Sequence, residues 1–142
     1  MNKNTGRALS VLKEENLTLV LCSEEETLKS EKRGVAALLE LYAKGKDLSA
    51  FCAADRVVGK GAAVFFSALG VKEVYAVVMS RDAQEILEKN GISFFCSETA
   101  DCILNRQKTG LCPIEKAVGE ERNLQKALAR IQSKVLELSG KA

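Results

Sequence analysis

The most informative feature of this 142-residue sequence is that it contains no histidine. Histidine is the usual general base and the commonest metal ligand, so its absence removes both roles together. Aromatic residues make up only 5% of the chain, which is little for a protein that stacks on single-stranded nucleic acid. The net charge is only +2, from 21 basic and 19 acidic side chains. That balance argues against nucleic acid or an anionic membrane surface as a partner.

Five cysteines are present, but no two of them form a C-x-x-C pair. Cys22, Cys52 and Cys96 lie in apolar runs, where a free thiol behaves as a small hydrophobic residue. An odd number without paired spacing argues against a disulfide framework and favours a reducing compartment. No signal-peptide segment and no membrane-spanning run is apparent. We therefore expect a cytoplasmic protein that does not insert into a membrane.

The length and the 46% apolar content predict one globular α/β domain over residues 1–142, without repeats or linkers. Apolar periodicity and Gly or Asn stop signals predict helices at 5–15, 34–43, 61–69, 80–90 and 123–138, a further helix after residue 112, and strands at 17–22, 27–30, 48–54, 71–79 and 92–96. Strands that alternate with helices pair in parallel, whereas the first two, joined by a short turn, must be antiparallel. The expected fold is a three-layer α/β/α arrangement around a mixed five-stranded sheet.

A polar segment, residues 55–60, separates the central predicted strand from a helix rich in small residues. Ligands of open α/β sheets bind at the carboxyl ends of strands. Asp55 could accept hydrogen bonds there, Gly59 would allow backbone amides to approach an anion, and Lys60 would add positive charge. The alternative is that Asp55 caps the helix, Lys60 is solvated and the glycine only eases packing.

The segment Cys112-Pro113-Ile114-Glu115 carries the signals of a helix start, because proline favours the first helical position. Cys112 would then be the N-cap, where the helix dipole favours a thiolate. A cysteine nucleophile is one hypothesis, with Asp55 or Glu115 moving protons. The alternative is a half-buried loop residue without a catalytic role.

Three more polar residues complete the candidate ligand-binding set, which also holds Glu115. Asn105 and Arg106 precede a Thr-Gly turn, and an arginine there could bind an anion through two hydrogen bonds. Arg33 lies at the start of the second predicted helix. A surface salt bridge or a solvated charge would explain either arginine equally well.

The order of elements resembles that of the cytidine-deaminase-like fold. Ala62-Ala63 and the run from Ser67 to Tyr75 are similar to the helix and the G-[IV]-K-x-V-x-Y strand of a zinc deaminase core. Residues 5–120 also resemble an uncharacterised prokaryotic family, a zinc-free branch of that superfamily. The segments that carry this likeness are 54–60, 105–106 and 109–115.

The resemblance implies where zinc would bind, and the chain lacks the ligands. Zinc deaminases need a His or Cys at one helix start, two Cys at the next, and a Glu acid/base. The two cysteine positions fall near Gly59 and Ala62, and the first-ligand position falls near Arg33-Gly34. We therefore expect no metal and no cofactor.

The leading hypothesis is a small-ligand site for a nucleotide-like or other anion, formed by Arg33, Asp55, Lys60, Arg106 and Cys112. Whether such a site turns a substrate over is left open by the sequence. The alternatives are a cysteine-dependent enzyme and a non-catalytic module that forms a homo-oligomer through the helix at 123–138.

Overall fold

The computed structural model describes residues 1–32, 35–104 and 112–139. The elements are α1 (Lys3–Glu14), β1 (Leu19–Cys22), β2 (Thr27–Ser30), α2 (Ala36–Ala43), β3 (Cys52–Val58), α3 (Lys60–Leu69), β4 (Glu73–Ser80), α4 (Arg81–Lys89), β5 (Ser93–Ala100), α5 (Pro113–Val118) and α6 (Leu124–Leu138). Each predicted helix and strand has its counterpart in this order. None of the helices in the described part of the chain has the length and apolar character needed to cross a bilayer.

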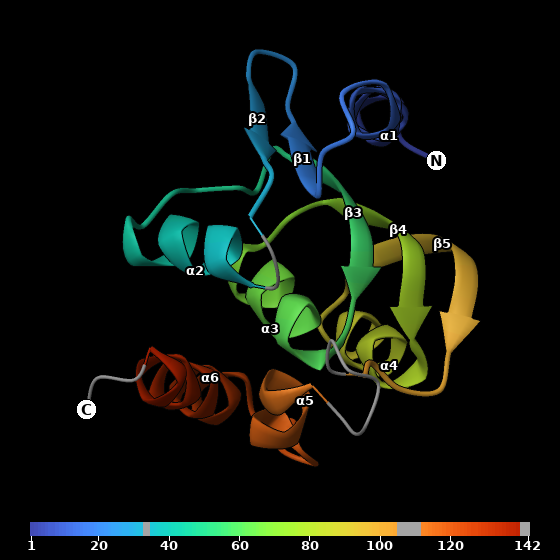
Figure 1. Ribbon diagram of the computed structural model, residues 1–142. Coiled ribbons are helices and arrows are strands. Elements are labelled where there is room, and N and C mark those ends of the chain that lie inside the picture. Colours follow the sequence, from blue (N-terminus) through green and yellow to red (C-terminus); the bar gives the residue numbers. More distant parts are fainter. Residues whose placement is uncertain (33–34, 105–111, 140–142) are drawn as a thin grey trace.

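The five strands form one mixed sheet in the order β2-β1-β3-β4-β5 (Figure 1). β1 pairs antiparallel with both β2 and β3, whereas β3, β4 and β5 are parallel to one another. Parallel neighbours need a crossover connection, and α3 and α4 provide the two crossovers. The mixed five-stranded sheet predicted from the sequence is therefore confirmed.

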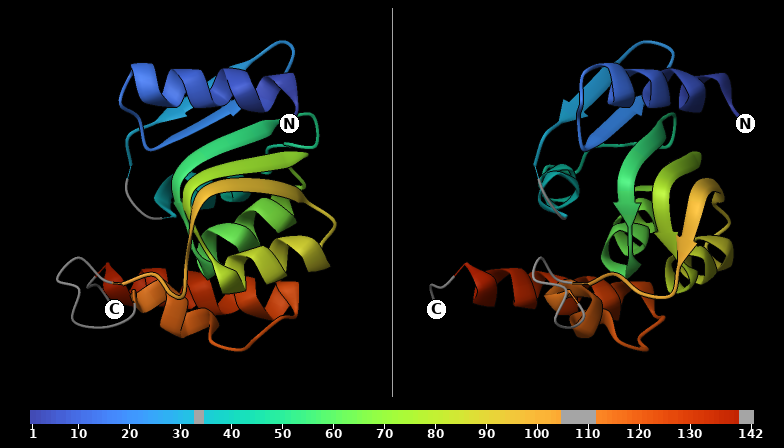
Figure 2. Two further views of the ribbon diagram at one scale, coloured as in Figure 1. Left: turned by 90° about the vertical axis from the view of Figure 1, so that its right-hand side faces the viewer. Right: turned by 45° about the vertical axis from the view of Figure 1, so that its right-hand side comes forward.

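Helices lie on both faces of the sheet, but unequally. α1 packs on one face, where Ala8 and Leu12 join Val20 and Ala54 in a small core. α3 and α4 lie on the other face, with α2 beside α3 (Figure 2). α5 and α6 contact α3 rather than the sheet, so α3 lies between the sheet and a further layer of helices (Figure 2).

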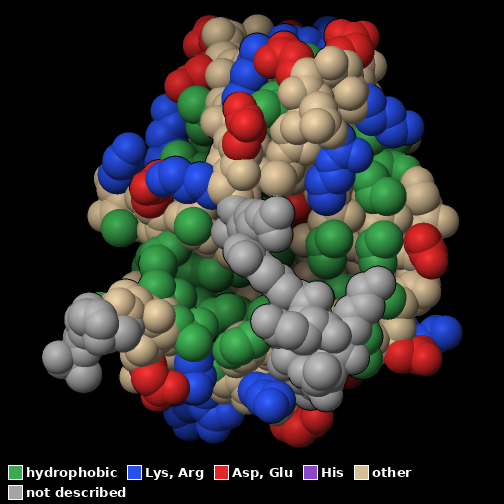
Figure 3. All heavy atoms as spheres, in the orientation of Figure 1, with side chains coloured by type: hydrophobic (Ala, Val, Ile, Leu, Met, Phe, Trp, Pro, Cys, Tyr) green, Lys and Arg blue, Asp and Glu red, His purple; other side chains and the backbone are tan. Residues whose placement is uncertain are grey.

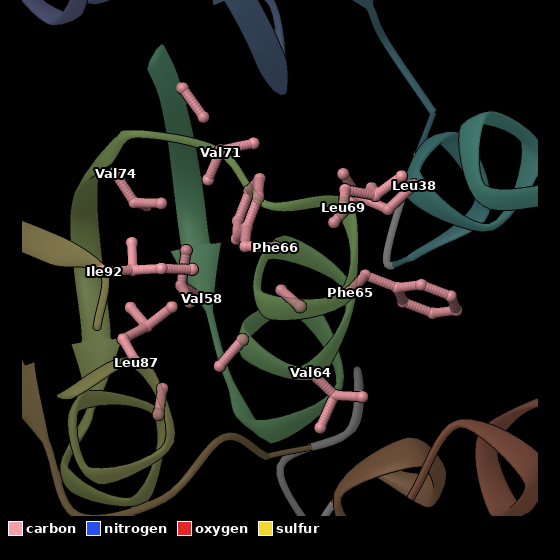
Figure 4. Packing of buried hydrophobic residues seen from close by; sticks show 14 of the residues in the cluster. Leu38, Val58, Val64, Phe65, Phe66, Leu69, Val71, Val74, Leu87 and Ile92 are labelled. Carbon is pink, nitrogen blue, oxygen red and sulfur yellow. The ribbon is translucent and has the colours of Figure 1, made fainter. Parts of the chain in front are cut away.

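α3 is the most deeply buried helix, because eight of its ten residues are inaccessible to solvent. Phe66 points toward the sheet, beside Val71 and Val74, whereas Val64 and Phe65 point away from it (Figure 4). A helix that is apolar on every side belongs in the interior of a fold. Its first N–H groups are then hidden from water and need partners from the protein.

β3 begins and ends four residues later than the sequence predicted, and it includes Asp55 because it extends to Val58. The polar pair Asp55-Arg56 suggested a turn, but the sheet extends through both residues. The Arg56 N–H donates to the Thr18 carbonyl at 3.2 Å, and Val58 pairs with Met79 of β4. Asp55 is thus a residue of the sheet and not of a loop at its edge.

The apolar face of α6, which the sequence offered as a surface for oligomer formation, is used within the chain. Ala127, Leu128 and Ile131 are at most 2% exposed and belong to the main core. They are buried because α6 packs against α3 and α5. This face is therefore not free to bind a second copy, and only Leu136 and Leu138 near its end remain exposed.

Candidate functional site

The starts of four helices meet at the carboxyl ends of β3 and β4. A Cβ atom placed on Gly61 at the start of α3 would lie 2.5 Å from Ile114 of α5 and 3.3 Å from Val35 before α2. Lys60 reaches Asp82 in the first turn of α4, with 3.7 Å between Nζ and Oδ2. This edge of the sheet is where open α/β folds bind ligands. Whether a ligand has room at this edge depends on the side chains that lie there.

Gly59, the N-cap of α3, is in direct contact with Glu115. A Cβ atom on Gly59 would lie 2.4 Å from Oε2 and 2.8 Å from Cδ of Glu115, and 2.9 Å from Ile103. Real Cβ atoms do not approach other atoms so closely, so a side chain at this position fits only if Glu115 and Ile103 move. The sequence suggested that this glycine lets an anionic ligand approach the backbone. In the structure, the anion beside it is the Glu115 carboxylate of the protein itself.

Glu115 caps the buried start of α3. It is 4% exposed, and the Gly61 N–H donates to its Oε2 at 3.4 Å. Burial raises the pKa of the Glu115 carboxyl, the amides of Gly61 and Lys60 and the Lys60 charge oppose that rise, and Asp82 adds to it. A carboxylate at a helix N-terminus is favoured by the exposed N–H groups and by the helix dipole.

Lys60 is the second buried charge in this region, at 8% exposure. Its ammonium donates to the Gly119 carbonyl at 2.9 Å and faces the Asp82 carboxylate. Arg122 shares both partners, since Nη1 donates to the same carbonyl at 3.0 Å and Nη2 lies 3.6 Å from Asp82 Oδ1. Its Nε also donates to Glu85 at 2.9 Å. We call Lys60, Asp82, Glu115 and Arg122 the buried ion cluster, after its two buried members Lys60 and Glu115, whereas Arg122 is partly buried and the Asp82 side chain is 43% exposed.

The structure thus brings Gly59, Lys60 and Glu115 together, as the hypothesis of a ligand site required. Their polar atoms, however, are paired with groups from the chain itself. Asp82 and Arg122 were not among the candidate residues. No local pattern could have revealed Arg122, because it reaches this place only through the packing of the α5–α6 segment on α3.

Asp55 lies apart from this cluster, on the inner face of the sheet. It pairs with Leu19 of β1 and Ala76 of β4, and both neighbours belong to the main core. Burial raises the pKa of the Asp55 carboxyl to about 7, and the backbone amides of Val57 and Arg56 only partly oppose this rise. A carboxyl group in a core-facing row, ionising near neutral pH, is typical of functional sites.

A groove opens beside Asp55, between α2 and the β1–β2 hairpin. Its volume is about 190 Å³. We call it the α2 groove, and its lining residues are Leu19, Leu21, Leu28, Lys29, Ser30, Lys32, Ala37, Glu40 and Leu41. The floor is aliphatic, and the side chains of Ser30, Lys32 and Glu40 form the polar part of the lining, whereas the Lys29 side chain points to the α1 side of the sheet and bonds Glu15. Asp55 does not itself line the groove, but it is the cross-strand neighbour of Leu19 in the floor.

Cys112 is the N-cap of α5, and Pro113 occupies the first turn, as the sequence predicted. The thiol is half-buried, and it makes no capping hydrogen bond. Its reactivity stays a prediction. The candidates Arg33, Asn105 and Arg106 lie outside the described residues.

Taken together, the geometry defines an α/β protein with a mixed five-stranded sheet, a helix-start cluster closed by its own Glu115, and an open groove beside a core-facing aspartate. The chain belongs to the family described as TM1506: domain of unknown function (DUF1893), whose model matches residues 7–135. It is similar to the crystal structure of a DUF1893 family protein (TM1506) from Thermotoga maritima, with 27% sequence identity and a TM-score of 0.86, over 94% of this chain and 92% of that one. No curated protein matches the sequence.

Proposed function

We propose that this protein is a small-ligand-binding domain on a cytidine-deaminase-like scaffold that has lost its metal site. The observation that carries the proposal is Asp55, a core-facing carboxyl with a raised pKa whose cross-strand neighbour Leu19 lines the α2 groove. Burying an acidic group among apolar neighbours is costly. A fold keeps such a group where a ligand or substrate uses it.

The scaffold part of the proposal rests on topology. The sheet order, the two antiparallel pairings of β1 and the helical crossovers on one face of the parallel strands all agree with that resemblance. The positions assigned to zinc-binding cysteines hold Gly59 and Ala62, and neither residue offers a ligand atom. Within residues 1–32, 35–104 and 112–139, no three His, Cys, Asp or Glu side chains are grouped as metal ligands.

The α2 groove favours an organic anion with an apolar body. Leu19, Leu21 and Leu28 provide apolar contact area, and Lys32 provides positive charge. Lys32 is in an exposed ion pair with Glu40. Such a pair contributes little stability, so an anionic ligand can replace the glutamate partner. Protonated or ionised, Asp55 could then hydrogen-bond a polar group such as a hydroxyl or an amine.

The alternative of a cysteine-dependent enzyme has one supporting observation, the N-cap position of Cys112. Glu115, the proton carrier suggested for it, is engaged with the Gly61 amide of α3. The ligand-binding function is therefore the better supported of the two.

A thermal-shift screen with mononucleotides, short-chain carboxylates and inorganic phosphate tests the proposal on the full chain. We expect a nucleotide or carboxylate to raise the melting temperature of the wild type, and Asp55→Asn and Lys32→Ala to reduce that shift by more than half. Lys44→Ala is the matched control, because this lysine is exposed at the end of α2 and does not line the groove. A shift that Asp55→Asn and Lys32→Ala leave unchanged, or no shift with any of these classes, would refute the proposal.

A further inference from the structure

On one face of the sheet, β5 and most of β4 are covered by no helix of the described part of the chain. α1 packs on β1 and β3 and reaches β4 at its first residue, where Thr5 and the Asn2 amide bond Glu73 at 2.6 and 2.7 Å. Within the described residues, no helix packs on the remainder of β4 or on β5 from this side. Parallel strands are almost always covered on both faces, so one uncovered face is unusual for them.

The parallel strands place more side chains on this face than a regular alternation would. In a regular strand, alternate residues face the same side. Ala76 and Met79 of β4 nevertheless both belong to the core on the α3 side, although they are three residues apart. On β5, Cys96 and Thr99 likewise both contact Gln84 of α4. Two consecutive residues between each of these pairs must therefore face the uncovered side.

The register between the strands is the same on both sides of this change, since Asp55 pairs with Ala76 and Val57 with Val78, although no pair forms at Val77 itself. All three parallel strands therefore shift their alternation at the same level, and all three are visibly curved in Figure 2. The result is a second apolar surface on a sheet that already has a buried core on its other side.

We call Val57, Tyr75, Val77, Val78 and Phe95 the outer-face patch. Val57 is 46% and Phe95 is 42% exposed, and the three others are half-buried. Tyr75 and Phe95 are neighbours on β4 and β5, as are Val57 and Val78 on β3 and β4. Hydrophobic side chains gather over these strands at the right of Figure 3. Contiguous exposed apolar surface of this kind marks an interaction site.

Opposite charges border the patch on its two sides. Arg56 lies on the β3 side, held beside α1 by hydrogen bonds to the Leu17 and Leu12 carbonyls at 2.9 and 3.2 Å. Glu98 lies on the β5 side, where it pairs with Val78 in the strand register and is exposed. One molecule thus presents a cation on one border and an anion on the other, at nearly the same level.

We propose that the outer-face patch binds a second copy of this chain in a symmetric dimer. A two-fold axis along β4 places the β3 side of one copy over the β5 side of the other. Val77 and Val78 then pack on their own counterparts, and Arg56 of each copy faces Glu98 of the other. The charge pattern is therefore self-complementary, as an isologous interface requires. The patch is small, so the dimer is weak and depends on concentration.

Sedimentation velocity on the full chain over a concentration series tests this proposal. We expect a monomer–dimer equilibrium for the wild type. Val57→Glu and Phe95→Glu each place a charge in the apolar contact and should weaken the dimer by at least about tenfold. Glu98→Lys should also weaken it, because like charges then face each other. Since all three side chains are exposed in the monomer, circular dichroism should show a folded chain.

Leu136→Glu is the matched control, because Leu136 is 70% exposed on α6, away from the patch. We expect this variant to dimerise like the wild type. A wild type that stays monomeric over the whole series would overturn the proposal. So would a dimer that Val57→Glu and Phe95→Glu leave intact, or one that only Leu136→Glu disrupts.

Discussion

Two groups of polar residues, predicted from the sequence as parts of one site, have opposite surroundings. At the start of α3, Lys60 and Glu115 are nearly inaccessible, and each is paired with groups of the same chain. Asp55 lies in the sheet between two core residues, and among the described residues only adjacent backbone amides oppose its burial. One group is closed and satisfied, whereas the other is half-buried beside an open groove.

The comparison separates structural charges from candidate functional ones. The buried ion cluster supplies the partners that a buried helix start needs, and it joins α5 to α3 and α4. Removing one member would leave others buried without a partner, which is costly. Asp55 supplies no such partner to a described neighbour, and its burial works against folding once it ionises. Perturbing the two groups should therefore change stability in opposite directions.

The largest loss is expected from Gly59→Ala. The new Cβ atom would overlap Glu115 and Ile103, so Glu115 must leave the start of α3 or the α5 segment must shift. We expect a loss of about 2–4 kcal/mol in the free energy of unfolding, from overpacking and the lost cap together. Chemical denaturation measures it.

Gly6→Ala is the control for this change, because nothing lies within 4 Å of a Cβ at that position in α1. Alanine favours a helix over glycine, so we expect this variant to be as stable as the wild type or slightly more stable. The double variant Gly59→Ala/Glu115→Ala should lose less stability than the sum of the losses of the two single variants. Full additivity would show that Glu115 is not what excludes a side chain at position 59.

A smaller loss is expected from Glu115→Ala, which leaves the Gly61 amide and the Lys60 ammonium with fewer partners. We expect about 1–3 kcal/mol. Glu115→Gln keeps an oxygen acceptor of the same shape and should lose clearly less. If both variants were equally unstable, the carboxylate charge, and not the hydrogen bond to the helix start, would be the stabilising feature.

The order and type of the elements could be predicted because apolar spacing and turn residues are local signals. The helix 123–138 and the strand 71–79 were found within two residues of their bounds in this way. The bounds of β3 could not be predicted in this way, because Asp55-Arg56 is a polar pair that only the neighbouring strands hold in extended form. Tertiary pairing there outweighs local propensity.

The candidate site was predicted in part for the same reason. Gly59, Lys60 and Glu115 were singled out by signals of a helix start, and they do come together. What those signals could not show is that Glu115 occupies the place assigned to a ligand. Asp82 and Arg122 were missed because their roles depend on contacts between segments far apart in the sequence. The α2 groove leaves no sequence signal at all.

An effect of opposite sign is expected from Asp55→Asn. Asp55 has a pKa of about 7 in the folded chain against its ordinary value of 3.8, so the folded state binds more protons between these pH values. Wild-type stability therefore falls as pH rises from about 4 to 7 and levels off above that. Asparagine cannot ionise, so the variant should be more stable than the wild type at pH 8. The expected gain is roughly 2 kcal/mol, less than the full pKa shift implies, because solvent still reaches this half-buried group.

Below pH 4 both forms are neutral at this position, so the difference between wild type and Asp55→Asn should vanish. Asp47→Asn is the control, because Asp47 is exposed and the Ser49 amide lowers its pKa. That change should lower stability slightly at pH 8, opposite to the effect at position 55. Melting temperatures at pH 4, 6 and 8 measure both differences. If Asp55→Asn were less stable than the wild type at pH 8, the ionised Asp55 would have a stabilising partner, and the contrast with the buried ion cluster would disappear.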